Sequence, residues 1–312
     1  DKMNRFSGDI SLNPRLLDNH LSIDASVKLS ATHNRFANKE AIGAAVQFDP
    51  TRPVRDNDPK FAPYGGYWTQ LDGTNLQKLA PKNPVALLEQ KEDVSDVFRT
   101  ISNLKLDYKV HFLPELKLNM NLGYDYASGK GHVIIPENSS LEWQRFTLKT
   151  TGQPDVLKSG KNNTYEQQKR SLLFDFYANY AKELQSLHSR IDVMAGYSYQ
   201  DWKTNVHNMP DYTYDKTIVS KPVFEYDYPQ NTLVSFYGRL NYSLLDRYLF
   251  TATVRTDGSS RFSKENRWGI FPALAFAWRI KEESFLKNVS WIDDLKLRLG
   301  YGVTGQQDGI GN

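Results

Sequence analysis

The chain contains no cysteine, and no apolar run is long enough to cross a bilayer as a helix. The missing cysteines exclude disulfides, thiolate metal sites and cysteine nucleophiles. A spanning helix needs about 20 predominantly apolar residues, so a helical membrane protein is excluded as well. The mean hydropathy of −0.59 looks like that of a soluble protein. It leaves a transmembrane β-barrel open, because about half of each barrel strand faces away from lipid.

The chain also lacks a strong charge imbalance and any motif of catalysis. With 39 basic and 36 acidic residues, it offers no basic stripe, and we predict no nucleic-acid partner. The six histidines show no metal-ligand spacing, and neither a nucleophile motif nor a paired-acid signature stands out. We therefore predict no enzyme activity, no metal and no cofactor.

Aromatic residues are abundant, at 13% of the chain, and they favour β structure. Residues 231–307 contain four successive runs in which one face is apolar and the other is polar or small. In the first run, one face carries Val234, Phe236, Leu240, Tyr242 and Leu244, and the other carries Ser235, Tyr237, Arg239, Asn241 and Ser243. A strand with this period of two suits a sheet that stands between lipid and water.

Similar runs begin at Leu21, Leu104, Leu116, Leu172 and Ile191, which brings the expected total to about ten strands. Short turns are expected at 15–19, 113–115, 183–186 and 245–247. Long polar stretches are expected at 37–99, 129–168 and 204–230, with a brief helix at 83–91. Residues 281–294 form one long connection on the short-turn side. Alternation of short turns with long loops predicts an antiparallel transmembrane β-barrel with periplasmic turns and extracellular loops.

Two long motifs resemble a known family. They are TVRTDGSSRFSKENRWGIFPALAFAWRI at 253–280 and DLKLRLGYGVTGQQDGIGN at 294–312. Together with NPVALLEQ from Asn83, AAVQFDPTRPV from Ala44, LDYKVHFLPELKLNMNLGYD from Leu106 and DVMAGYSYQDW from Asp192, they are similar to the SusC/RagA family. These proteins are TonB-dependent outer-membrane transporters of Bacteroidetes-type bacteria. The resemblance spans nearly the whole chain.

The resemblance implies a plugged barrel of about 22 strands. It also implies a SusD-like surface lipoprotein as a lid, contact with TonB through a plug, and oligosaccharide or sometimes peptide cargo. A dimer of transporter–lid pairs in the bacterial outer membrane is a further implication. Residues 1–312 are expected to form part of a single barrel. The plug and the last strands are expected to be absent from this chain, which ends at Asn312 without an aromatic-terminated strand.

Two other interpretations remain open. A small stand-alone outer-membrane barrel, such as a porin or adhesin, is possible in principle because membrane barrels begin at eight strands. A soluble β-sandwich that binds or cleaves glycans is the other, and it would remain monodisperse without detergent.

Two groups of loop residues are candidates for contact with cargo or a partner. Tyr64, Tyr67 and Trp68 in PYGGYW could stack on sugar rings or apolar side chains of the cargo, or could pack against the lid or a neighbouring loop. Arg255, Asp257 and Arg261 surround a DGSSRF turn. They could meet anionic cargo or lipopolysaccharide, or could form a mutually paired set that stabilises the loop.

Overall fold

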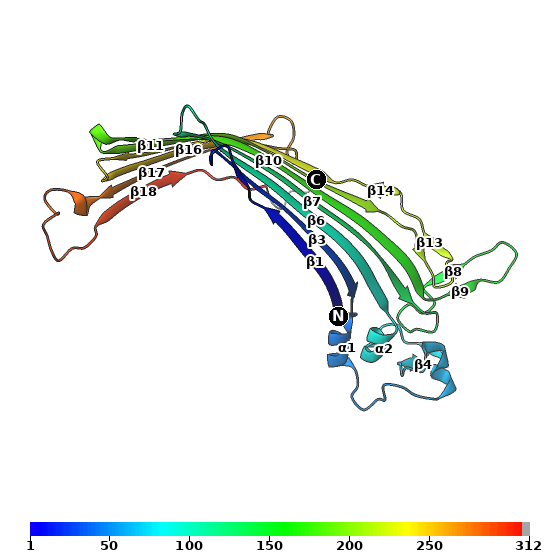
Figure 1. Ribbon diagram of the computed structural model, residues 1–312. Coiled ribbons are helices and arrows are strands. Elements are labelled where there is room, and N and C mark those ends of the chain that lie inside the picture. The colour runs from blue at the N-terminus through cyan, green and yellow to red at the C-terminus, as the bar shows by residue number, and fades with distance from the viewer. Residues whose placement is uncertain (308–312) are drawn as a thin grey trace.

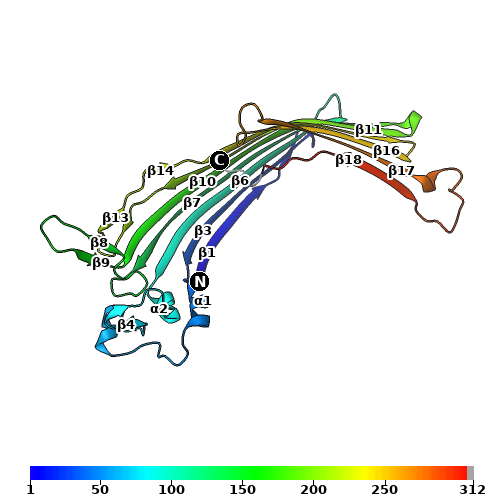
Figure 2. The same cartoon turned by 180° about the vertical axis from the view of Figure 1, so that it is seen from behind.

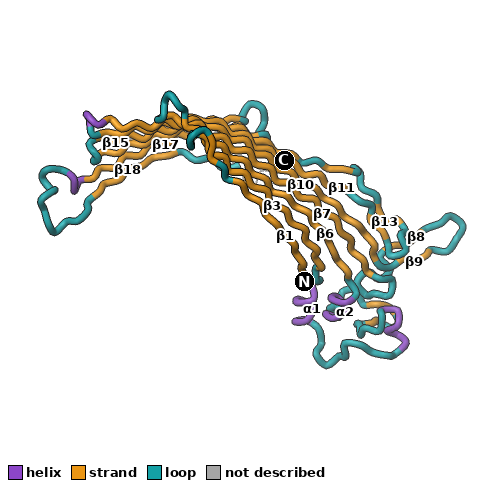
Figure 3. The backbone as a smooth tube through the Cα atoms, viewed as in Figure 1, coloured by secondary structure: helices purple, strands orange, loops and turns teal. Residues whose placement is uncertain are grey.

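A computed structural model describes residues 1–307 as one broad antiparallel sheet that curves like part of a cylinder wall (Figures 1–3). Its ten main strands lie in chain order, each paired antiparallel with the next. They are β1 (Lys2–Leu12), β3 (Leu21–Arg35), β6 (Glu92–Lys109), β7 (Leu116–Ile135), β10 (Lys161–Leu184), β11 (Ser189–His207), β15 (Gln230–Leu244), β16 (Tyr248–Ser259), β17 (Trp268–Arg279) and β18 (Lys296–Gly302). This architecture confirms the predicted all-β fold. The last five residues of the second family motif, 308–312, lie outside the described residues.

Short elements complete the fold. β2 (Arg15–Leu16) and β14 (Tyr226–Asp227) pair with the large sheet. Three small ribbons lie in the long connections: β4 (Leu71–Asp72) with β5 (Asn75–Leu76), β8 (Phe146–Leu148) with β9 (Val156–Lys158), and β12 (Asp211–Tyr212) with β13 (Ile218–Ser220). The helices are α1 (Glu40–Gln47), α2 (Pro84–Glu89) and the 3₁₀ turns η1 (Pro59–Tyr64), η2 (Gln185–Leu187) and η3 (Ile280–Glu282). None of the helices in residues 1–307 has the length and apolar character needed to span a bilayer.

The cross-strand register places the predicted apolar faces on one side of the sheet. Directly opposed residues on neighbouring strands point to the same side. One such row consists of Ala25, Leu104, Leu122, Phe174, Tyr199 and Val234. A row on the other side consists of Asp107, Asn119, Tyr177, Gly196, Tyr237 and Arg255. The sheet therefore has an apolar face and a polar face, as the alternation predicts.

The strands run further into the long loops than predicted. β6 begins at Glu92, β7 continues to Ile135, and β10 begins at Lys161, although these residues were expected in loops. The predicted boundaries were wrong because charged and apolar residues are mixed on the side of the apolar face here, as Asp96 and Phe98 are on β6. One row on the side of the apolar face consists of His33, Asp96, Lys130, Glu166 and His207. The hydrogen-bonded ladder continues where the regular alternation of apolar and polar residues has already ended.

Two of the short turns share a backbone conformation. Leu17 and Asp18 have φ angles of 55° and 52°, and Leu245 and Asp246 both have φ of 53°. Each pair lies in a Leu-Leu-Asp sequence between two strands. Left-handed residues fit a tight hairpin because their backbone twist matches that of the flanking strands. A bulky leucine in this conformation is strained, so the sheet on both sides must hold it there.

An aromatic side chain ties three strands together on the polar face. The Tyr237 ring on β15 lies over Gly196 on β11, where a Cβ atom would come within 2.5 Å of the ring. Its hydroxyl donates a 2.7 Å hydrogen bond to Asp175 on β10. Any larger residue at position 196 would displace the ring and break this bridge.

The two faces can be tested with adjacent substitutions on β15. Leu240 lies on the apolar face and is 40% exposed, whereas Asn241 lies on the polar face. Leu240→Arg should lower the free energy of unfolding by about 2–4 kcal/mol if it lies near the middle of the bilayer, and Asn241→Arg should be tolerated. Denaturant unfolding of the whole barrel in lipid vesicles measures both. Equal losses at the two positions would contradict the assignment of the faces.

Candidate functional site

The first long loop, residues 36–91, has a packed core of its own. Phe61, Tyr64, Tyr67 and Leu87 are only 1–4% exposed. They come from η1, the segment after it, and α2, which gather beyond the ends of β3 and β6 (Figure 1). α2 begins at Pro84, so the predicted brief helix and its first-turn proline are confirmed. This loop is therefore a preformed surface at what we call the loop end of the sheet, the end that carries the three long loops.

Asn83 organises this core. Its side-chain oxygen accepts hydrogen bonds from the backbone N–H groups of Val85 and Ala86, which caps α2. Its amide nitrogen donates to the carbonyl oxygens of Val54 and Trp68, at 2.8 and 3.1 Å. Asn83 is fully buried. One side chain thus joins the helix to two backbone segments that lie well before it in the chain.

Tyr67 belongs to a hydrogen-bonded group with Arg55 and Glu89. The Arg55 guanidinium lies 2.5 Å from the Tyr67 hydroxyl and 2.7 Å from a Glu89 oxygen, and the hydroxyl donates to the same carboxylate. The hydrogen bonds from Tyr67 and Arg55 lower the pKa of Glu89. Glu89 therefore stays ionised at neutral pH and holds both partners in place.

The structure places the three aromatic candidates in the loop core. Tyr64 and Tyr67 are 2% and 4% exposed, and Trp68 is half-buried against the edge of the Phe48 ring. Gly65, at φ 72°, makes the turn between them, where a Cβ atom would come within 2.5 Å of the Gln90 side chain. Of the two interpretations of PYGGYW, this burial favours loop packing for the two tyrosines. Their contact with cargo stays an untested prediction.

The first and second loops are joined through Gln90. Its amide nitrogen donates to the carbonyl oxygens of Tyr64 and Asn138, at 3.2 and 3.0 Å. Its amide oxygen accepts a 2.9 Å hydrogen bond from Ser139, which is completely buried. The Tyr64 ring also packs edge-on against Trp143, with 5.0 Å between centroids.

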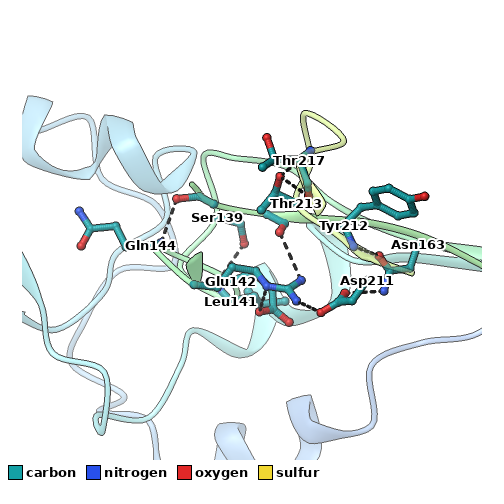
Figure 4. Close-up of polar contacts among 12 residues, drawn as sticks. Ser139, Leu141, Glu142, Gln144, Asn163, Asp211, Tyr212, Thr213 and Thr217 are labelled. Carbon is teal, nitrogen blue, oxygen red and sulfur yellow. Dashed lines mark hydrogen bonds and ion pairs between the residues drawn. The ribbon is translucent and has the colours of Figure 1, made fainter. Parts of the chain in front are cut away.

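The second and third loops are joined by a further polar network (Figure 4). Asp211 accepts a 2.6 Å hydrogen bond from Asn163 on β10, and it forms an ion pair with Arg145. The Asn163 side-chain oxygen accepts from the backbone N–H of Tyr212 at 2.8 Å. These contacts make the three long loops one connected surface over β6, β7, β10 and β11.

A second junction lies beside this network. Asp215 is 2.5 Å from both the Lys158 ammonium and the Thr213 hydroxyl. The hydrogen bond from Lys158, followed by that from Thr213, lowers the pKa of Asp215 well below its usual range. The carboxylate therefore remains charged, and the junction remains closed, across any physiological pH.

The charged candidates lie at the loop end of β16. The Arg255 guanidinium pairs with Asp257 at 2.7 Å, donates to the Ser235 hydroxyl at 2.9 Å and lies over the Tyr237 ring. Arg261 donates to the carbonyl oxygen of Gln307 at 3.1 Å. The predicted pairing of Arg255 with Asp257 is thus present. Arg255 still exposes 44% of its side chain on the polar face, so the pair can also reach a ligand.

The polar face of the sheet suits hydrogen bonding to a polar solute. The polar face carries amides, hydroxyls and paired charges that offer hydrogen bonds, and residues 1–307 hold no group of three or more side chains suited to a metal ion. The contacts made by Gln90, Ser139, Arg145 and Asp211 were not predicted from the sequence. Each joins segments far apart in the chain, and no local pattern marks such a residue.

Comparison with known proteins identifies the fold and the family. The profile of the family described as "TonB dependent receptor-like, beta-barrel" matches residues 30–309. The chain belongs to this TonB-dependent receptor β-barrel family. It is 38% identical to the TonB-dependent receptor SusC of Bacteroides thetaiotaomicron, over 97% of this chain and 30% of that protein. It is 30% identical to the TonB-dependent receptor P39 of Formosa agariphila, over 76% of this chain and 22% of the relative.

Solved structures agree on the barrel. The RagAB peptide importer in its closed-closed state matches 99% of this chain with a TM-score of 0.69 and 18% sequence identity. The chain covers 33% of that structure's chain, and a second RagAB structure matches with a TM-score of 0.65. The chain spans about a third of the length of SusC and of the RagAB chain that it matches. The family consists of outer-membrane receptors and not of enzymes.

Removal of the Asn83 side chain tests the organisation of the first loop. Asn83→Ala takes away the helix cap and two buried amide hydrogen bonds, so segments 54–68 and 85–90 should open more readily, by about 1–3 kcal/mol. Hydrogen exchange of the whole protein measures this opening. Asn75→Ala is the matched control, because Asn75 is exposed in the same loop. Unchanged exchange in Asn83→Ala would show that the loop core does not depend on it.

Proposed function

We propose that the protein to which this chain belongs imports nutrients across the bacterial outer membrane in a TonB-dependent manner. The observation that carries the proposal is the 38% identity with SusC over 97% of the chain, which includes the loops as well as the strands. The polar face of the sheet, which would line the barrel interior, supports it. The proposed cargo is an oligosaccharide, with a peptide as the second candidate because RagAB is named a peptide importer.

The chain spans about a third of the length of SusC and of the matched RagAB chain, and we therefore propose which part of the transporter it supplies. Residues 1–312 would supply the middle of a single barrel. The plug, which contacts TonB, and the closing strands would come from the rest of the polypeptide. A SusD-like lipoprotein would sit as a lid on the connected loops, and transporter–lid pairs would form a dimer. No catalytic step is part of this proposal.

Energy dependence separates this proposal from a porin. A strain that lacks the full-length transporter should lose uptake of the cargo, and an uncoupler that collapses the proton gradient should stop uptake in the wild type while surface binding persists. Uptake of labelled oligosaccharides and peptides measures both effects and the cargo class. Uptake that continues after uncoupling would favour passive diffusion through an open barrel and would refute the proposal.

Among the six candidate residues, we place cargo contact at Arg255 and Asp257. Their side chains lie on the polar face near its loop end and remain partly exposed, whereas Tyr64 and Tyr67 are enclosed. Arg255→Gln should weaken cargo binding by about tenfold, the effect of one lost charge-assisted hydrogen bond. Calorimetry on the purified transporter–lid complex measures the affinity. Tyr64→Phe is the control, and a larger loss there than in Arg255→Gln would reverse the assignment.

A further inference from the structure

On the side of the apolar face, which we call the outer face, the chemistry changes in a regular order toward the loop end. One row contains Tyr124 and Leu172, directly opposed on β7 and β10, and continues to Ser102 on β6 and Asp201 on β11. The next row on this face consists of Tyr126, Arg170 and Lys203. Beyond it lie the opposed amides Gln168 and Asn205, and then Glu166, His207 and Tyr226. On β10 and β11 the order is therefore Leu172 with Asp201, then two cations, then two amides, and then Glu166 with His207.

An apolar groove lies immediately below the cationic row. It has a volume of about 580 Å³ and includes Ile10, Leu12, Leu104, Leu122, Leu172 and Phe174 in its lining. Ile10 and Leu12 are 70% and 64% exposed. Leu172 lies two residues from Arg170 on the same strand and face, so this part of the groove lies beside the cations. A hydrocarbon chain in this groove would bring its polar end to the cationic row.

The cationic row carries more positive than negative charge. Arg170 and Lys203 are directly opposed, an unfavourable arrangement for like charges. Asp201 lies 3.3 Å from Arg170, and it also accepts hydrogen bonds from Gln230 and Thr232. Within residues 1–307, Lys203 forms no ion pair with a carboxylate, and its ammonium lies 5.4 Å from the centre of the Tyr228 ring. One carboxylate therefore faces two cations, which leaves room for an external anion.

Beyond the cations, the outer face offers hydrogen-bonding groups. His207 stacks on Tyr226 with 4.5 Å between ring centroids, and Tyr226 stacks on Tyr228 at 6.0 Å. The two tyrosines are 40% and 53% exposed. Together with Gln168 and Asn205, they form a surface suited to the hydroxyl groups of a sugar.

We propose that this outer wall binds a phosphorylated glycolipid of the outer leaflet. Its acyl chain would occupy the apolar groove, its phosphate would lie between Arg170 and Lys203, and its sugar would contact the tyrosines. The order of groups along the wall matches the order of groups in such a lipid. A free phosphate or a free glycan would contact only part of this surface. The inference rests on the proposed membrane location, but it concerns the outside of the barrel and not the cargo path.

The test uses the full-length transporter in nanodiscs and native mass spectrometry. The probes are diphosphorylated lipid A, the same lipid after removal of its phosphates, and phosphatidylglycerol. The wild type should retain the phosphorylated form about tenfold better than the dephosphorylated form, since a charge-assisted contact is lost. Lys203→Gln, which leaves the Arg170–Asp201 pair in place, should abolish most of this preference. Tyr226→Ser should weaken lipid A but not phosphatidylglycerol.

Lys117→Gln is the matched control. Lys117 lies opposite another lysine, Lys109, but near the other end of the sheet and on the polar face. It should retain lipid A as well as the wild type does. Equal retention of the phosphorylated and dephosphorylated forms by the wild type, or an equal loss in Lys117→Gln and Lys203→Gln, would overturn the proposal. Cargo uptake measured in parallel separates the two hypotheses, because failure of lipid binding with intact energy-dependent uptake refutes the glycolipid site alone.

Discussion

The continuous hydrogen-bonded ladder of the large sheet is the constraint on which the rest of the structure depends. Side chains alternate along each strand, so a slip of one residue between two strands would exchange the apolar and polar faces beyond that point. The register carries one apolar row from Ala25 to Val234 without such a slip. Tyr237 reinforces it on the polar face, since its ring crosses Gly196 to reach Asp175. The lipid-facing wall and the interior lining are thus set by the same hydrogen bonds.

The loops are ordered by a different principle. The sheet has no core of its own, because each face is one layer of side chains, whereas the first loop encloses Phe61, Tyr64 and Leu87. Asn83 and Gln90 satisfy backbone groups that burial would otherwise leave unpaired. The Arg145–Asp211 pair then connects the second loop to the third. A lid that docks on this end would therefore meet a preformed surface and would spend little free energy on ordering it.

The repeated alternation along the strands could be predicted from the sequence, whereas the individual contacts within the loops could not. Period-two alternation located the strands and their faces, because the polarity of each residue in a barrel strand depends on the face of the sheet on which it lies. It ended early in β6, β7 and β10, where residues such as Asp96 and Lys130 carry charge on the outer face and the contrast between faces disappears. PYGGYW was interpretable either as a binding motif or as a core, since an aromatic residue serves both. The burial of Tyr64 and Tyr67 favours a core, and it depends on contacts that no local pattern shows.

The point at which the alternation ends, where the predicted strand boundaries were wrong, also has a physical meaning. A barrel strand loses its apolar outer residues where it leaves the hydrocarbon, so the change from Leu172 to Arg170 marks a depth in the membrane. Charged residues at this depth are stable only with partners, and Asp201 satisfies one cation of two. The remaining positive charge faces the zone in which the outer leaflet holds its phosphates. In the proposed glycolipid site, this positive charge would bind the phosphate of the lipid, because the register of β10 and β11 holds Arg170 and Lys203 opposite each other.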